Sequence, residues 1–155
     1  MSASSDRRVA VLTLGGTIAM TGQDGARVTP TLTAENLVDA VPGLAETGIT
    51  VEVRDFRQLP GASLTYADLL DLLHQIENLD VDGVVITQGT DTIEETSFFL
   101  DLLHTTPVPI VVTGAMRNAS LAGPDGPANL LTAIRVAAST NAQGLGCVVV
   151  FADQI

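Results

Sequence analysis

The sequence predicts an α/β fold of three layers, in which a mainly parallel sheet carries helices on both faces. Short apolar runs alternate along the chain with longer stretches of helical periodicity. Three of the runs are near-continuous Val, Ile and Leu, as in strands that are buried on both faces. The 155 residues are enough for one such domain with a sizeable core and no disulfide.

Five segments are expected to form strands. The second of them alternates apolar and polar residues, which favours a place at an edge of the sheet. The expected strands cover residues 9–14, 50–56, 83–87, 108–113 and 146–151.

The helical segments begin at recognisable caps. Thr65 and Thr92 are each followed three residues later by an acid, which is a variant of the capping box. Asp125 is interpreted as the cap of the last helix, because a proline stands in the first turn that follows it. The expected helices begin at Thr33, Thr65, Thr92 and Asp125.

Charge and composition exclude several classes of protein. The formal net charge of −11 would repel a phosphate backbone, so nucleic acid is not an expected partner. No apolar run approaches the roughly 20 residues that span a membrane, and the N-terminus carries no signal-peptide pattern, so we expect a cytoplasmic protein. Cys147 is interpreted as a small core residue, and His74 and His104 as structural or solvent-facing, so no metal site is expected.

Two turns that contain glycine and threonine directly follow predicted strands. In the first, Gly15 and Gly16 allow a tight turn and let a ligand approach backbone N–H groups. Thr17 then stands where a hydroxyl can act as a nucleophile once a base accepts its proton. The alternative is that Thr17 merely caps the turn. A phosphate-binding loop is not indicated, because the glycine spacing does not fit and the chain has no lysine.

The second turn consists of Gln88, Gly89, Thr90, Asp91 and Thr92. Its helix N-terminus suits a carboxylate, and the Asp91 side chain suits an ammonium group, so an amino acid would match both. The alternative is a set of solvated loop side chains. Because strands of a parallel sheet end at the same edge, we expect the two turns to converge on one ligand.

Two further segments have possible roles. The polar stretch 23–33 is long enough to fold over the first turn as a lid. Arg117 ends the string Gly-Ala-Met-Arg after the fourth strand, where it can bind a carboxylate or pair with a surface acid, and we favour the surface acid.

Several strings together resemble the bacterial-type L-asparaginase/glutaminase family. They are VLTLGGTIA, ENLVDAVP, VVITQGTDTIEETSFFLDLL, VVTGAMR and DGPANLLTAI, and they occur in the order of the family. The resemblance implies a flavodoxin-like N-terminal α/β domain over residues 1–155, with the family's C-terminal domain absent. It also implies hydrolysis of the side-chain amide of L-asparagine to L-aspartate and ammonia, without a metal or organic cofactor.

The same resemblance implies roles for individual residues. Thr17 matches the nucleophilic threonine of the family, and Thr90 and Asp91 match its second threonine and the acid that grips the α-amino group. The expected substrate-binding positions are Gly16, Ala62, Ser63, Gly89, Thr90 and Asp91. Family members are homo-oligomers, so self-association is expected as well.

The chain departs from the family pattern at four places. The second triad of the family ends in a lysine, which this chain lacks and which would lie beyond Ile155. The tyrosine of the family's lid is also missing. Ala62 and Ser63 stand where the family offers a serine and a polar neighbour to the substrate carboxylate. Gln88 replaces the usual histidine. Weak or absent activity therefore follows unless the proton has another route.

The departures leave other functions open. A non-catalytic amino-acid-binding module would keep Thr90 and Asp91 and lose the groups that transfer protons. The asparaginase-like subunit of a glutamine-dependent tRNA amidotransferase is an alternative within the enzyme class. A flavodoxin-like binder of phosphate or nucleotide is weaker, because no phosphate-binding pattern is present.

Overall fold

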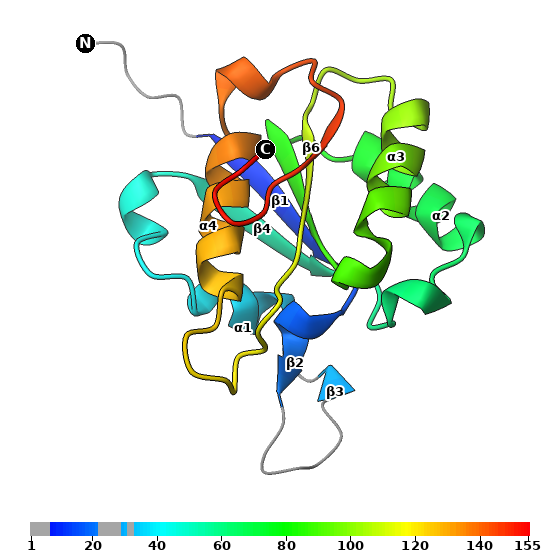
Figure 1. Cartoon of the computed structure of the whole chain (residues 1–155). Coiled ribbons are helices and arrows are strands. Elements are labelled where there is room, and N and C mark those ends of the chain that lie inside the picture. The colour runs from blue at the N-terminus through cyan, green and yellow to red at the C-terminus, as the bar shows by residue number, and fades with distance from the viewer. Residues whose placement is uncertain (1–6, 22–28, 31–32) are drawn as a thin grey trace.

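A five-stranded sheet, parallel throughout, forms the centre of the computed structural model, and helices lie on both sides of it (Figure 1). The structure describes residues 7–21, 29–30 and 33–155. The spatial order of the strands is β4-β1-β5-β6-β7. Renumbered along the chain, this is the flavodoxin-like order 2-1-3-4-5, whose switch point lies between β1 and β5. The sheet strands are Arg8–Thr13 (β1), Thr50–Asp55 (β4), Gly83–Thr87 (β5), Ile110–Thr113 (β6) and Cys147–Val149 (β7).

The predicted strands are confirmed, with small differences at their ends. The alternating segment, β4, lies at one edge of the sheet as expected. The last strand is shorter than predicted, because the chain folds back in a bridge between Phe151 and Gln154. The Val150 N–H still donates to the Val112 carbonyl, so the pairing with β6 continues by one residue past the end of β7.

In the described part of the chain, four α-helices connect the strands, and side-chain caps explain the starts of two of them. Thr33 and Thr65 each accept a hydrogen bond from the backbone three residues on, and both capping boxes are complete. Thr92 occupies the N-cap position of the third helix but makes no such bond, so its predicted capping box is wrong. The helices are Ala34–Asp39 (α1), Tyr66–Glu77 (α2), Ile93–Leu103 (α3) and Gly126–Ala137 (α4).

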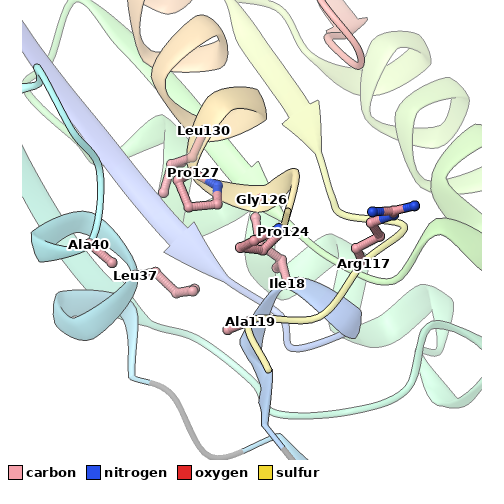
Figure 2. A pocket seen from close by; sticks show the side chains of 9 residues that line it. All are labelled: Ile18, Leu37, Ala40, Arg117, Ala119, Pro124, Gly126, Pro127 and Leu130. Carbon is pink, nitrogen blue, oxygen red and sulfur yellow. The ribbon is translucent and has the colours of Figure 1, made fainter. Parts of the chain in front are cut away.

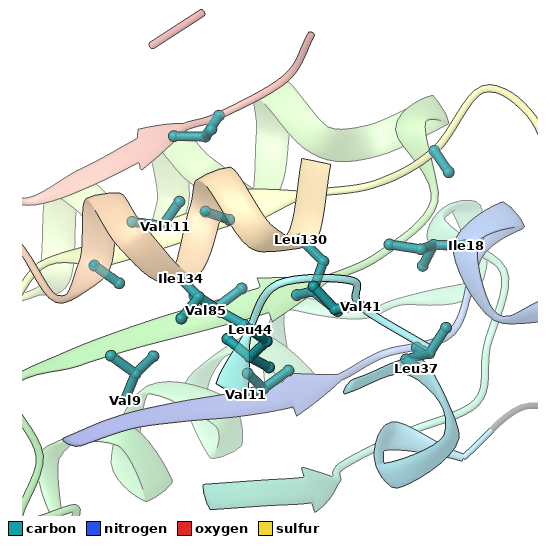
Figure 3. Close-up of a cluster of buried hydrophobic side chains, with 14 of the residues drawn as sticks. Val9, Val11, Ile18, Leu37, Val41, Leu44, Val85, Val111, Leu130 and Ile134 are labelled. Atoms are coloured by element: carbon teal, nitrogen blue, oxygen red, sulfur yellow. The ribbon is translucent and has the colours of Figure 1, made fainter. Parts of the chain in front are cut away.

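Each face of the sheet has its own hydrophobic core. Alternate residues of β1 divide between them, so Val9 and Val11 face α1 and α4 while Ala10 and Leu12 face α2 and α3. Figure 3 shows the first cluster, in which Leu130 and Ile134 of α4 lie over Val85 of β5. The strands β1, β5 and β6 are buried almost throughout, which confirms their interpretation as central strands.

A short hairpin follows the first turn. Met20–Thr21 (β2) pairs antiparallel with Thr29–Pro30 (β3), and Figure 1 shows the pair projecting below the sheet. Within the predicted lid over 23–33, Thr29–Pro30 forms this pairing and Thr33 caps α1, and the folding of the stretch over the first turn stays a prediction. Residues 22–28 and 31–32 of that predicted lid lie outside the described residues. In the described part of the chain, no helix is both long and apolar enough to cross a bilayer.

Candidate active site

The two threonine-containing turns meet at the carboxyl end of the sheet. They follow β1 and β5, the two strands that flank the switch point. Gly16 has a φ of +83°, and a Cβ added there would collide with the backbone of Gly89. Backbone therefore packs on backbone where the turns touch, and only glycine fits at position 16. The two turns thus touch at Gly16 and Gly89, and their convergence on one ligand stays a prediction.

The first turn leads into a single 3₁₀ turn, Thr17–Ala19 (η1). The Ala19 N–H donates to the Gly16 carbonyl at 3.1 Å, which closes this turn. Ile18 is buried and anchors it to the core. The side chain of Thr17 lies outside what the structure describes, so the nucleophile role stays a prediction.

The second turn is a 3₁₀ turn as well, Thr90–Thr92 (η4), and it leads directly into α3. The Asp91 side chain is exposed, and its Oδ2 accepts a hydrogen bond from the Ala62 N–H at 3.0 Å. A Cβ added at Gly61 would collide with the Asp91 Oδ1 and the Thr92 hydroxyl. The turn Gly61–Ser63 (η3) thus lies directly against the Asp91 carboxylate.

The predicted residues accordingly lie in one region. Ala62 and Ser63 come from the turn after β4, Gly16 from the turn after β1, and Gly89 to Asp91 from the turn after β5. These three strands are adjacent in the sheet, which explains how segments far apart in sequence reach one place. The region offers an exposed carboxylate, the half-buried Thr90 and the N-terminal end of α3, a helix of 11 residues. An ammonium group and a carboxylate on one small molecule fit this arrangement.

The side chain of Gln88 contacts the second turn from the interior of the protein. It is fully buried, and its Nε2 donates to the Gly89 carbonyl at 3.2 Å and approaches the Thr92 hydroxyl at 3.5 Å. Its Oε1 meets no hydrogen-bond donor among the described residues. The contact with Gln88 accounts for the missing cap of α3, because the Thr92 side chain is directed toward Gln88 instead.

A cleft of about 360 Å³ borders the region on the side of α2 and α3. Gly61, Ala62 and Thr92 form the wall that it shares with the candidate site. The cleft is also lined by Tyr66, whose ring stacks on Phe99 at a centroid distance of 5.4 Å. Thr90 and Asp91 do not line it, so the cleft lies next to the candidate site and is not part of it.

Two predictions for the loop after β6 need correction. Asp125 stands at the N-cap position of α4, but its carboxylate makes no capping bond and instead accepts from the N–H groups of Met116 and Arg117. The guanidinium of Arg117 donates to the Ala122 carbonyl at 2.9 Å, and no ion pair with an acid is found for it among the described residues. The local turn provides this acceptor, so a surface acid is not needed.

The remaining candidates behave as structural residues. The thiol of Cys147 packs against the second core cluster, and burial, followed by the nearby Asp101 charge, raises its pKa to about 12. His104 bonds to the Val108 carbonyl at 2.7 Å, and His74 is exposed on α2. Within residues 7–21, 29–30 and 33–155, no three His, Cys, Asp or Glu side chains are grouped to hold a metal ion.

The sequence analysis assigned no role to Asn129, a polar residue that the structure buries. It is 4% exposed and lies on the buried stripe of α4 beside Leu130 and Ala133. A polar residue on an otherwise apolar helical stripe is the signal that would have identified it.

Comparison with known proteins identifies similar chains. The family model described as the N-terminal part of asparaginase matches residues 8–155. L-asparaginase 2-3 of Saccharomyces cerevisiae is 38% identical over 159 residues, which cover 98% of this chain and 44% of that protein. The glutaminase-asparaginase of Pseudomonas fluorescens biotype A is 39% identical over 155 residues, which cover 95% of this chain and 42% of that protein.

A solved structure has the same fold. It is that of a probable cytoplasmic L-asparaginase from Campylobacter jejuni, with a TM-score of 0.89 and 32% sequence identity. The match covers 96% of this chain and 47% of that chain. The present chain thus spans less than half the length of these relatives.

Proposed function

Because this chain belongs to the asparaginase family, we propose that it serves the hydrolysis of the side-chain amide of L-asparagine to L-aspartate and ammonia. Residues 1–155 act in this proposal as the family's N-terminal α/β domain. The observation that carries it is the meeting of the two turns at the switch point, with Asp91 held beside them by the Ala62 N–H. Open α/β sheets bind small molecules at such a point.

The chemical step is an acyl transfer. The Thr17 hydroxyl attacks the amide carbon, and backbone N–H groups of the turns stabilise the oxyanion. The C–N bond breaks, and the nitrogen leaves as ammonia with the proton that the Thr17 hydroxyl gave up. Water then hydrolyses the ester, which releases aspartate and restores the hydroxyl. The glycine at position 16 supports this role, because it lets the backbone approach a bound substrate closely.

The substrate is held by its two charged ends. The Asp91 carboxylate accepts hydrogen bonds from the α-ammonium group, and Thr90 lies next to Asp91 on the same turn. The Gly89 backbone and the Ser63 hydroxyl bind the substrate carboxylate in this proposal, because the N–H groups of Ala62 and Ser63 already donate to Asp91 and Pro60. The bond from the Ala62 N–H fixes the Asp91 carboxylate before the ligand arrives, which lowers the cost of ordering it.

A second function is favoured by one observation on the sequence. The stretch 20–33 contains no tyrosine, although the lid tyrosine of the family helps to activate the first threonine, and such general-base help is worth roughly 10²–10⁴-fold in rate. A non-catalytic or weakly active amino-acid-binding module would use the same Asp91 contacts. The two functions differ in ammonia release and agree in aspartate binding.

Ammonia release from asparagine tests the catalytic reading. We expect the Thr17→Ala variant to lose at least about a hundredfold in kcat, because the nucleophile is gone. Thr140→Ala is the matched control, since Thr140 is an exposed threonine in the turn before β7, at the other end of the sheet. Equal rates for wild type and Thr17→Ala would remove Thr17 as the nucleophile. Glutamine is tested in parallel, because the Pseudomonas relative carries both names.

Calorimetric binding of aspartate tests the grip on the substrate. We expect Asp91→Asn to weaken binding by roughly 10–100-fold, as for a lost charge-assisted hydrogen bond. Asp80→Asn is the control, because Asp80 is an exposed acid that pairs with Arg8 beside the amino end of β1. Unchanged aspartate affinity in Asp91→Asn would contradict both the enzyme and the binding module.

We also propose that the protein self-associates and works in the cytoplasm. Tyr66 is 74% exposed and Phe98 67%, so α2 and α3 present apolar surface to the solvent. The name of the Campylobacter neighbour supports the compartment. Light scattering of the purified chain would give its mass in solution, and a monomer at micromolar concentration would contradict self-association.

A further inference from the structure

The loop between β6 and α4, residues 114–125, and the first residue of α4 contact both threonine-containing turns. A Cβ added at Gly114 would lie 2.7 Å from the Gln88 carbonyl oxygen and 3.2 Å from Cγ2 of Thr90. Directly after the loop, a Cβ added at Gly126, the first residue of α4, would lie 3.0 Å from Cγ1 of Ile18, the neighbour of Thr17. The β6–α4 loop therefore backs the second turn directly, and the start of α4 backs the first turn through Ile18.

Two polar side chains fasten this loop. The carboxylate of Asp125 accepts from the Met116 N–H at 3.0 Å and from the Arg117 N–H at 2.8 Å. The Nδ2 of Asn129 donates to the Gly114 carbonyl at 3.0 Å and to the Asp125 Oδ2 at 3.2 Å. One connected set of bonds thus joins the start of the loop to the first turns of α4.

Asn129 also reaches a third segment. Its Oδ1 accepts the Ala152 N–H at 3.1 Å, so both its donor and its acceptor groups are used. Partial burial alone would raise the pKa of Asp125, but the N–H groups of Met116 and Arg117 outweigh it and hold that pKa below its usual value. The pair is therefore in its bonded, charged form over the ordinary pH range.

Packing alone does not set the position of the loop. Figure 2 shows Pro124 and Gly126 beside Ile18, with the Arg117 side chain extended away from them. A small apolar cavity of about 40 Å³ remains among Ile18, Leu37 and Leu130. The chain is packed closely against Ile18 at Gly126 but leaves this cavity beside it, so the polar pair shares with packing in defining where the loop lies.

We propose that Asp125 and Asn129 are a positioning pair that seats Gly114 behind Thr90 and so fixes the Thr90 side chain in the active site. The inference rests on the proposed function, because the role of Thr90 does. Asp91 is held separately, by Ala62 and Gly61. Loss of the pair should thus misplace Thr90 and leave the grip on the α-ammonium group in place.

The expected effect is a split between kcat and KM. A shift of about 1 Å in a catalytic group can cost roughly a hundredfold in rate, so we expect losses of about 10–100-fold in kcat. KM should stay within about twofold, since a change confined to the transition state leaves ground-state binding alone. A variant that only lowered the folded fraction would also lower the apparent kcat at constant KM, so kcat is referred to the concentration of folded protein and the side chain of Thr90 is followed directly.

The test compares Asn129→Leu and Asp125→Asn with wild type. Asn129→Leu removes the side-chain bonds at similar volume, and Asp125→Asn leaves the bond from Asn129 to Gly114 possible. Gln143→Leu is the control, because Gln143 donates from its side-chain amide to the Asp82 carbonyl at the opposite end of the sheet. The readouts are kcat and KM for asparagine, and the methyl resonance of Thr90 in protein with labelled threonine.

We expect both variants to lower kcat and to shift the Thr90 methyl resonance, and Gln143→Leu to do neither. Unchanged kcat and an unmoved resonance would overturn the inference. If wild type neither releases ammonia nor binds aspartate, the proposed function fails, and the Thr90 resonance alone then decides for or against the pair. If Asn129→Leu does not fold, Asp125→Asn is judged by itself.

Discussion

The two ends of the parallel sheet hold their carboxylates in different ways. At the amino end, Asp82 takes the Arg7 guanidinium at 2.6 Å and the Arg8 N–H at 2.9 Å. At the carboxyl end, Asp91 and Asp125 are held by backbone N–H groups of neighbouring turns. Arginine neutralises the charge of a carboxylate, whereas a carboxylate held only by N–H groups keeps its charge and can still bind a cationic ligand. The difference between Asp82 and Asp91 indicates that Asp82 stabilises the fold and that Asp91 is arranged for binding. The carboxylates of Asp125 and Asp68, also at the carboxyl end, are bonded to Asn129 and Arg57.

The largest effect should come from filling the contact between the turns. Gly16→Ala adds a side chain where Gly89 backbone lies, at a φ of +83°, and we expect a loss of about 3–5 kcal/mol in the free energy of unfolding. Gly48→Ala separates the two causes, because Gly48 has a φ of +69° but open space around it, and should cost about 1–2 kcal/mol. Equal losses in urea titrations would mean that the two turns are not in close contact.

The next effect is a contrast between two variants, one at each end of the sheet, in stability and in aspartate affinity. Asp82→Ala leaves the half-buried Arg7 without its carboxylate, so we expect about 2 kcal/mol less stability and unchanged aspartate affinity. Asp91→Ala should do the reverse, with near-wild-type stability and weak aspartate binding. Paired urea and calorimetry measurements on both variants check this. The comparison of the two ends fails if either variant changes both quantities alike.

A smaller effect concerns acid. The folded-state pKa of Asp125 is lowered, so its contribution to stability is present above the ordinary pKa of 3.8 and is lost as the pH falls through the folded value. Wild type should therefore exceed Asp125→Asn by a constant margin near neutral pH, and the margin should shrink below about pH 3.8. Unfolding at a series of pH values measures it. A margin that grows toward low pH would contradict the assigned hydrogen bonds.

The smallest effect concerns the thiol at the amino end. With a pKa of about 12, Cys147 carries almost no thiolate at pH 8, so the folded chain should react very slowly with a thiol reagent. The urea-unfolded chain should react at the rate of a free cysteine. Rapid labelling of the folded chain would contradict the burial of Cys147 against the core.

The sequence predicted the framework better than the contacts between loops. Residues 83–87 were predicted as a strand with the bounds that the structure has, because polar residues, Asp82 and Gln88, flank the buried apolar run on both sides. The start of α3 was predicted less well, since the direction of the Thr92 side chain depends on Gln88 in space. The bonds of Asp125 were not predicted at all. They join it to a turn nine residues away, and nothing local favours them over an ordinary helix cap.

The central claim, that two distant turns form one amino-acid site, is tested most directly by following backbone amide resonances during an aspartate titration. We expect the N–H signals of Gly16 and Gly89 to shift together and to give the same Kd, although the two residues are far apart in sequence. A response confined to one turn, or two different Kd values, would contradict a shared site.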